Sequence, residues 1–222
     1  MAPSLATPRA AVASMGVKED LAKELCPAIG YFDPLGLAEA DFWSKGNEAT
    51  WGFLRQAEIK HGRVAMFAFV GYCAQANNIH FPYFMGQPTF GATPEEQWFN
   101  LPVAGRAQII GFIGFLEWWG EFEGPNPHYM KGGKPGVYPS FDNFPQGFYP
   151  LPKKISLYDP FGIAVKDSDE KKAKGLLAEI NNGRLAMIGI MGFVAESKVP
   201  GSVPALEGLI KPFSGDIMAP LA

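Results

Sequence analysis

Two nine-residue stretches place possible metal ligands at the head of apolar segments. They read EIKHGRVAM at residues 58–66 and EINNGRLAM at residues 179–187, so the copies are offset by 121 positions. Residues three apart on a helix share a face, so each copy would present two electron-pair donors to one side. The residues concerned are Glu58, His61 and Arg63 in the first copy and Glu179, Asn182 and Arg184 in the second.

These donors admit two kinds of metal chemistry. A di-iron carboxylate site uses Glu-x-x-His from each of two helices, but the second copy has Asn182 where iron would need a histidine, and the arginines compete for the carboxylates. Magnesium accepts oxygen or imidazole donors and rarely has an all-protein cage. A magnesium ion held in a chlorin ring needs only one further donor, so this chemistry is favoured and an iron enzyme is the disfavoured alternative.

The arginines need partners of their own. Glu58 and Arg63 are five residues apart, a poorer spacing within one helix than three or four. Parallel repeats in a membrane are typically related by a two-fold axis along the membrane normal, which predicts ion pairs between the copies. The expected pairs are Glu58 with Arg184 and Glu179 with Arg63. Small residues, Gly62 and Gly183 among them, would let the two backbones approach each other.

Three apolar-rich segments are expected to be helices, at about residues 50–77, 101–120 and 172–197. The 20 prolines lie almost wholly outside them, and proline disrupts a helix interior. The third has a capping-box-like start at Asp167 with Glu170. Its roughly 25 residues would reach about 37 Å, enough for a bilayer core of about 30 Å. None contains 18 consecutive apolar residues, however, so hydropathy alone leaves open a membrane span or a buried soluble helix.

A related loop precedes each motif. YFDPLGLA at residues 31–38 matches LYDPFGIA at residues 157–164, so the duplicated unit is a loop followed by a helix. The proline and glycine also suit an ordinary turn that leads into a helix. The connection between residues 124 and 161 is longer than the usual limit of about 12 to 15 residues. It is rich in aromatic side chains, which indicates that it packs on an apolar surface.

Composition narrows the class of protein. The chain is 47% hydrophobic and only 18% charged, against about 25% charged in typical domains, so many side chains must lie away from water. A net charge of −3 argues against a nucleic-acid partner, because such proteins usually carry a basic face. Cys26 and Cys73 form no metal or disulfide pattern. His80 and His128 fit hydrogen-bonded or exposed roles better than ligation. Residues 1–17 lack acidic side chains, which suits a targeting segment or its remnant and an ordinary frayed terminus about equally.

The two GRxAM motifs, each preceded by a DPxG loop, resemble the first and third helices of the light-harvesting chlorophyll-binding family over about residues 31–199. RAQIIGFIGFLEWWGE at residues 106–121 is closer to the chlorophyll a/c antennae of the fucoxanthin and peridinin types, with the dinoflagellate type preferred. The resemblance implies an all-α membrane protein with three transmembrane helices, of which the first and third cross about a pseudo-two-fold axis. It divides the chain into an N-terminal segment 1–30, a pigment-binding domain 31–199 and a C-terminal tail 200–222.

The same resemblance implies site residues. The implied chlorophyll magnesium ligands are Glu58, His61, Gln108, Glu117, Glu179, Asn182 and Glu196, with Arg63 and Arg184 as the family's cross-helix partners. At Glu196 relatives often carry glutamine or histidine, so this position departs from the pattern. The implied carotenoid-binding loops are Asp33, Pro34, Leu35 and Gly36 in the first copy and Asp159, Pro160, Phe161 and Gly162 in the second.

The implied function is that of an antenna, not an enzyme. Chlorophyll a, chlorophyll c and a carotenoid (peridinin, fucoxanthin or a related xanthophyll) would be held in the plastid thylakoid membrane, and excitation would pass to a photosystem. Implied partners are a photosystem core, with photosystem I favoured, neighbouring antenna subunits and thylakoid lipids. The alternative within the family is a photoprotective protein that dissipates energy.

Overall fold

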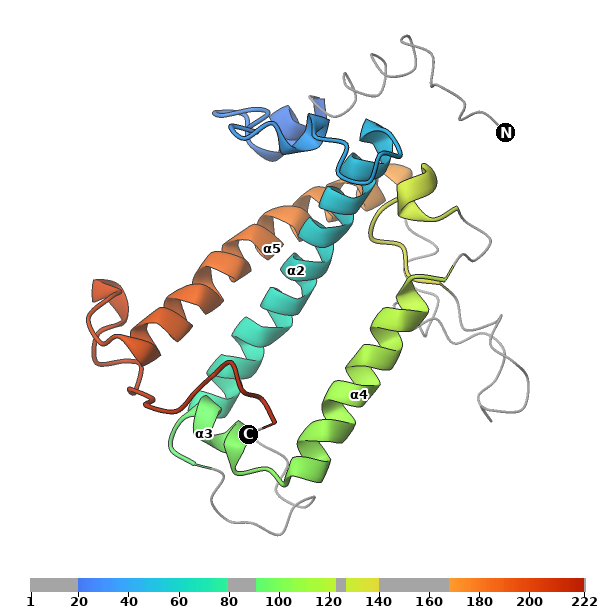
Figure 1. Cartoon of the computed structure of the whole chain (residues 1–222). Helices are drawn as coiled ribbons and strands as arrows, with labels where there is room; N and C mark the ends of the chain where they lie inside the picture. The colour runs from blue at the N-terminus through green and yellow to red at the C-terminus, as the bar shows by residue number, and fades with distance from the viewer. Residues whose placement is uncertain (1–19, 80–90, 123–126, 140–167, 222) are drawn as a thin grey trace. The chain divides into compact units, whose positions relative to one another are not determined.

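The described part of the chain is helical. The computed structural model describes residues 20–79, 91–122, 127–139 and 168–221, and these ranges contain no β-strand. The long helices are α2 (Asn47–Ala76), α4 (Val103–Gly120) and α5 (Asp169–Lys198), shown in Figure 1. They correspond to the expected helices at about 50–77, 101–120 and 172–197, with ends that differ by at most three residues.

Shorter elements connect the long helices. A short helix, α3 (Pro94–Phe99), precedes α4, and residues 20–25 are also helical. Three 3₁₀ turns complete the described structure: η1 (Leu37–Glu39), η2 (Tyr129–Lys131) and η5 (Pro204–Leu206). Within the described ranges, no helix combines the length and the apolar character that a membrane-crossing segment requires.

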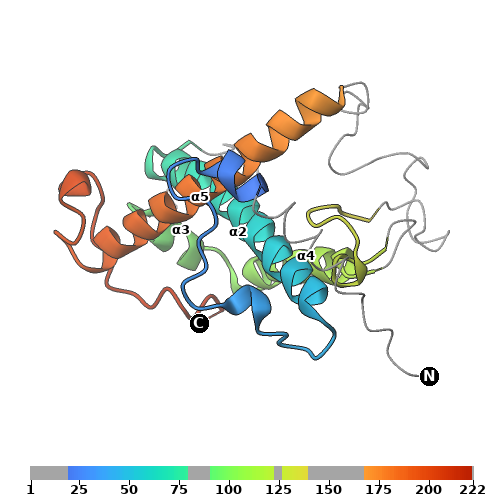
Figure 2. The ribbon, with the colours of Figure 1, turned by 90° about the horizontal axis from the view of Figure 1, so that it is seen from above.

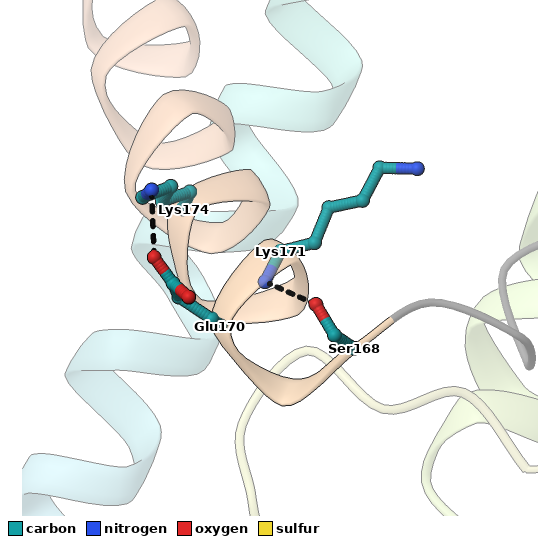
Figure 3. A network of polar contacts seen from close by, with 4 residues as sticks. All are labelled: Ser168, Glu170, Lys171 and Lys174. Atoms are coloured by element: carbon teal, nitrogen blue, oxygen red, sulfur yellow. Dashed lines mark hydrogen bonds and ion pairs between the residues drawn. The ribbon is translucent and has the colours of Figure 1, made fainter.

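Side-chain caps start two of the helices. The backbone N–H of Lys171 donates to Oγ of Ser168 at 3.3 Å, and Lys174 pairs with Glu170 at 2.8 Å one turn along α5 (Figure 3). The expected capping residue, Asp167, lies outside the described residues. At α3 the Oγ1 of Thr93 accepts from the N–H of Glu96. Both caps satisfy donors that a helix start leaves without an intrahelical partner.

The chain forms two compact units. The first combines residues 1–60 with 122–181, and the second combines residues 61–121 with 182–222. The division crosses α2 after residue 60 and α5 after residue 181, which are equivalent positions of the 121-residue repeat.

A small apolar core organises the first unit. Leu25, Ile59 and Ile180 are buried, and Leu21, Leu176 and Leu177 pack against them. Nδ2 of Asn181 donates to the carbonyl of Leu25 at 3.4 Å, which joins α5 to the end of the helical stretch at residues 20–25. Ile59 and Ile180 are repeat equivalents, so the duplicated motif supplies the same buried position from both helices.

The described part of the long connection packs against α2 in the first unit. The N–H of Gly136 donates to Oε1 of the buried Gln56 at 2.6 Å. A Cβ at Gly52 would collide with the backbone carbonyl of Tyr129, so that close approach requires glycine. Of the aromatic residues expected to anchor this connection, Tyr129 and Tyr138 are described, and those at 141, 144, 148 and 149 lie outside the described residues.

Backbone proximity joins α2 and α5 in the second unit (Figures 1 and 2). A Cβ at Gly62 would lie 3.0 Å from the Cα of Gly183, and a Cβ at Gly183 would lie 2.8 Å from the Cα of Gly62. These two glycines are the small residues expected at the approach. Further along, the rings of Phe69 and Phe193 stack with centroids 4.9 Å apart.

Candidate functional site

The two copies of the motif have matching exposure along α2 and α5. The functional residues fall in the same exposure class in both copies: Glu58 and Glu179 are half-buried, His61 and Asn182 exposed, Gly62 and Gly183 buried, and Arg63 and Arg184 half-buried. Two other pairs of the motif differ, since Lys60 and Ala65 are each more buried than Asn181 and Ala186. The imidazole and the amide are therefore the donors that project from the helices, while the carboxylates lie nearer the protein interior.

Large apolar side chains surround the exposed donors. Val64 and Leu185, each three residues after a donor, are 65% and 69% exposed. Phe67 and Ile188, a further three residues along, are 83% and 73% exposed. Exposed apolar side chains in such groups usually mark a surface that something else covers.

Glu58 has a partner that was not predicted from the sequence. Nη1 of Arg55 donates to Oε2 of Glu58, three residues along α2, and both side chains are largely shielded from solvent. The sequence did contain a signal for this ion pair, since opposite charges three residues apart on a helix are favourably spaced. Leu176 occupies the equivalent position on α5, so this ion pair belongs to the first copy alone. The expected pairs Glu58 with Arg184 and Glu179 with Arg63 stay predictions.

The two candidate ligands on α4 both face outward. Gln108 and Glu117 are exposed and nine residues apart, so they lie on different faces of the helix, as expected from their spacing. A Cβ at Gly105 or Gly111, each three residues from Gln108, would meet no other atom within 4 Å. These glycines leave the backbone beside Gln108 accessible to a flat group.

Glu196 is engaged by the loop that follows α5. The residue is only 2% exposed, and its carboxylate accepts hydrogen bonds from the N–H of Gly201 at 2.8 Å and of Val203 at 2.9 Å. The Oγ of Ser202 is a third donor, at 3.5 Å. Ligation of magnesium by Glu196 stays a prediction, and the geometry adds a loop-organising role that the sequence did not indicate.

The first DPLG loop forms a compact turn around Asp33. Its carboxylate accepts from the N–H of Leu37 and of Ala38, both at 3.0 Å, and from the hydroxyl of Tyr31 at 3.1 Å. These hydrogen bonds, that of Ala38 above all, hold the pKa of Asp33 below its usual value. Leu35 at the tip is exposed. The turn predicted from Pro34 and Gly36 thus leads into η1, whereas Asp159, Pro160, Phe161 and Gly162 lie outside the described residues.

Other candidates are placed as follows. Nδ1 of His128 accepts from the N–H of Met130 at 3.2 Å, which caps η2 and agrees with the hydrogen-bonded role expected for it. His80 lies outside the described residues. In the ranges that the structure covers, no three or more His, Cys, Asp or Glu side chains gather into a group that could hold a metal ion.

The donor set suits magnesium that is already held in a ring. Carboxylate and amide oxygens are hard donors of the kind that magnesium takes. The imidazole nitrogen is a borderline donor, but each group needs to fill only the one open position of an ion already held in a ring. His61 and Asn182 are exposed on helix surfaces beside apolar side chains, as an apolar macrocycle with a polar centre requires. The residues present therefore fit a chlorophyll.

The described structure defines a helical protein in which the two copies of the duplicated motif lie on α2 and α5. The chain matches the chlorophyll A-B binding protein family over residues 17–198, and it belongs to that family. This is a family of pigment-binding proteins, not of enzymes.

Relatives from three organisms match most of the chain. A fucoxanthin-chlorophyll a-c binding protein of Trieres chinensis is 32% identical over 189 residues, which cover 80% of this chain and 78% of the relative. Protein F of the same description from Phaeodactylum tricornutum is 32% identical over 204 residues, covering 89% and 88%. Protein F from Macrocystis pyrifera is 32% identical over 180 residues, covering 77% and 71%. All three carry the description chloroplastic.

Proposed function

We propose that the protein is a light-harvesting antenna that binds chlorophyll a, chlorophyll c and a carotenoid and passes excitation to a photosystem. The observation that carries the proposal is the matched display of His61 and Asn182 on α2 and α5, each beside exposed apolar side chains. Family membership and the pigments named in its relatives agree with it.

The chlorophylls are assigned to individual donors. His61 and Asn182 each hold the magnesium of one ring from the outward face, and Glu58 and Glu179 hold one each from the half-buried face. Gln108 and Glu117 serve separate faces of α4. The bound ring supplies light absorption and energy transfer, whereas the chain fixes the ring's position and excludes water from the metal.

The protein is placed in the thylakoid membrane of a plastid, with α2, α4 and α5 as its three spans. The 30 residues of α2 and of α5 reach about 45 Å and the 18 residues of α4 about 27 Å, against a hydrocarbon core of about 30 Å. Two helices separated by one span run in the same direction, which agrees with a parallel repeat. Bound pigments would cover the polar donors that lower the hydropathy of these helices.

In this proposal the charges of the motif on α2 and α5 are neutralised by two symmetric ion pairs, Glu58 with Arg184 and Glu179 with Arg63. An intramembrane charge costs about 2.5 to 3.5 kcal/mol at mid-span on insertion scales, so pairing is expected. Glu58→Ala should therefore destabilise the complex more than the double variant Glu58→Ala/Arg184→Leu. If the double variant is no milder, the pair with Arg184 is wrong and Arg55 is the partner that matters.

Pigment analysis tests the function. Extraction of the purified protein should yield chlorophyll a, chlorophyll c and abundant carotenoid, and a colourless protein would refute the antenna. The names of the relatives favour fucoxanthin, and the same extract distinguishes it from peridinin. Co-purification with photosystem I rather than photosystem II would support the favoured partner, and the opposite result would reverse it.

Fluorescence lifetime separates harvesting from dissipation. An antenna should keep a long-lived excited state in the isolated complex. A complex that is strongly quenched under the same conditions would instead identify the energy-dissipating alternative.

A further inference from the structure

The C-terminal strap, defined as residues 211–221, is fixed at one end to the last turn of α5. The N–H of Phe213 donates to the carbonyl of Ser197 at 2.8 Å. Nζ of Lys198 donates to the carbonyls of Phe213 and Gly215. These contacts all lie in the second unit, and they turn the chain back after α5 ends.

The other end of the strap is held by α3 and α4. The carbonyl of Pro220 accepts two hydrogen bonds, from Nε1 of Trp98 at 3.0 Å and from Nη1 of Arg106 at 3.2 Å. The donors come from α3 and from the first turn of α4, 122 and 114 residues away in sequence. One carbonyl of the strap thus joins two elements that directly follow each other in the chain.

Two stacked rings with a cation on each side lie between these ends. The guanidinium of Arg106 lies 5.6 Å from the centre of the Phe99 ring. That ring stacks on Phe213, with centroids 5.8 Å apart and planes 13° from parallel. Nζ of Lys198 lies 5.4 Å from the centre of the Phe213 ring. Such cation–π contacts are stabilising, the more so where water is excluded, so the stack ties α4 to α5 through the strap.

Arg106 makes the start of α4 depend on the strap. The residue is only 4% exposed, and a buried cation is costly unless its donors are satisfied. The residue that precedes α4, Pro102, provides no side-chain cap. Gln108, the candidate chlorophyll ligand, follows Arg106 by two residues on the same helix.

We propose that the C-terminal strap positions the first turns of α4 and thereby the chlorophyll bound at Gln108. Arg106 is the positioning residue, since its buried guanidinium donates to the strap, and Gln108 is the ligand. The proposal rests on the proposed function for the identity of the bound group, whereas the placement of α4 by the strap is independent of it.

The pigment test compares two variants of the full complex reconstituted with pigments. Removal of residues 216–222 deletes the Pro220 carbonyl, and Arg106→Met deletes its donor while leaving an apolar side chain of similar length. Each should lose about one chlorophyll per chain, and the combination should lose no more than either alone. Leu209→Ala, an exposed position of the C-terminal region, is the control and should keep every pigment. Full pigment content in both variants would overturn the proposal.

A distance measurement judges the strap without reference to pigment. Spin labels are attached at Ile113→Cys of α4 and Met191→Cys of α5, both exposed positions of the second unit, in a chain whose Cys26 and Cys73 are changed to Ser. Removal of residues 216–222 should broaden or shift the distribution of distances between the labels, and Arg106→Met should do the same. Arg106→Lys should change the distribution less than Arg106→Met does. An unchanged distribution refutes the positioning role.

Gln108→Leu in the full-length chain separates the two ideas. If this variant keeps its chlorophyll, the ligand assignment of the proposed function fails, and the spin-label distance alone decides the strap. A second outcome is that truncation changes the spin-label distance but keeps the chlorophyll that Gln108→Leu loses. The strap would then position α4 without affecting the chlorophyll at Gln108, and the proposed effect on that chlorophyll would be wrong.

Discussion

Replacement of Gly183 by alanine probes the approach of α2 and α5. The added Cβ would lie 2.8 Å from the Cα of Gly62, and the contacted atom belongs to the backbone. A flexible side chain could turn aside, but here the two helices must separate. The separation between the two helices would then increase, and with it the distance between the charged and donor residues of the two copies.

The expected magnitude combines two opposing effects. Overpacking a close contact costs about 1 to 3 kcal/mol, while alanine in place of glycine stabilises a helix by about 1 kcal/mol. The net loss is therefore about 0 to 2 kcal/mol. Gly175→Ala is the matched control on the same helix, because its Cβ would meet no atom within 4 Å, and it should stabilise by about 1 kcal/mol. The helix-propensity effect cancels between the two variants, which leaves a difference of about 1 to 3 kcal/mol.

Thermal unfolding of the pigmented complexes, followed by far-ultraviolet circular dichroism, measures that difference. For a chain of this size 1 kcal/mol corresponds to about 2 to 4 °C in Tm, so Gly183→Ala should melt roughly 2 to 12 °C below Gly175→Ala. Equal melting temperatures would show that Gly62 and Gly183 are not in backbone contact, and the reasoning would fail.

Four further substitutions test individual residues. His61→Leu and Asn182→Leu should each remove about one chlorophyll per chain and leave the helix content intact; a full pigment count in both would contradict their roles as ligands. Glu196→Gln keeps one oxygen donor for magnesium but places an N–H₂ group where the loop after α5 needs an acceptor. Because a hydrogen bond to a charged group contributes about 1.5 to 3 kcal/mol, Tm should fall by several degrees with the pigment content unchanged, and an unaltered Tm would refute the loop role. Because the pKa of Asp33 is lowered in the folded chain, its carboxylate stabilises the turn fully above the ordinary pKa of 3.8, and this stabilisation is lost as the pH falls through the lowered folded pKa. Proteolysis of the turn should therefore accelerate in that acid range in the wild type. If Asp33→Asn shows the same acid dependence, Asp33 is not the titrating group.

Much of the fold could be predicted because its causes are local. Proline is excluded from the interiors of α2, α4 and α5, and the repeat of the motif by itself assigns equivalent positions to Ile59 and Ile180. Helical geometry also placed each glutamate near the donor three residues along, but it did not predict that the donor is exposed and the glutamate half-buried. The approach at Gly62 and Gly183 was expected because helices that cross closely need small residues.

The features that were not predicted depend on contacts between residues far apart in sequence or on local signals that are weak. The sequence Thr93-Pro94-Glu95-Glu96 carries a capping signature for α3, but a six-residue helix gives too short a periodicity to detect. The engagement of Glu196 by residues 201–203 depends on the path of the loop after α5. The contact of Arg106 with Pro220 spans 114 residues, and no pattern along the chain connects them.

The exposed apolar side chains bear on why charged residues stand in the interior of α2 and α5. Each of Val64, Phe67, Leu185 and Ile188 is more than 60% exposed, and burial of such a side chain is favourable by about 1.5 to 3 kcal/mol. The polypeptide alone does not realise that gain, since these side chains project away from its own core. A ring with an apolar rim and a metal centre would bury these side chains and would also bind the nearby imidazole or amide through its metal. The donor and the exposed apolar side chains therefore favour the same ligand. In the proposed assignment Glu58 and Glu179 would each bind a ring and pair with a guanidinium, and both interactions would lower the cost of a repeated charge cluster in an apolar environment.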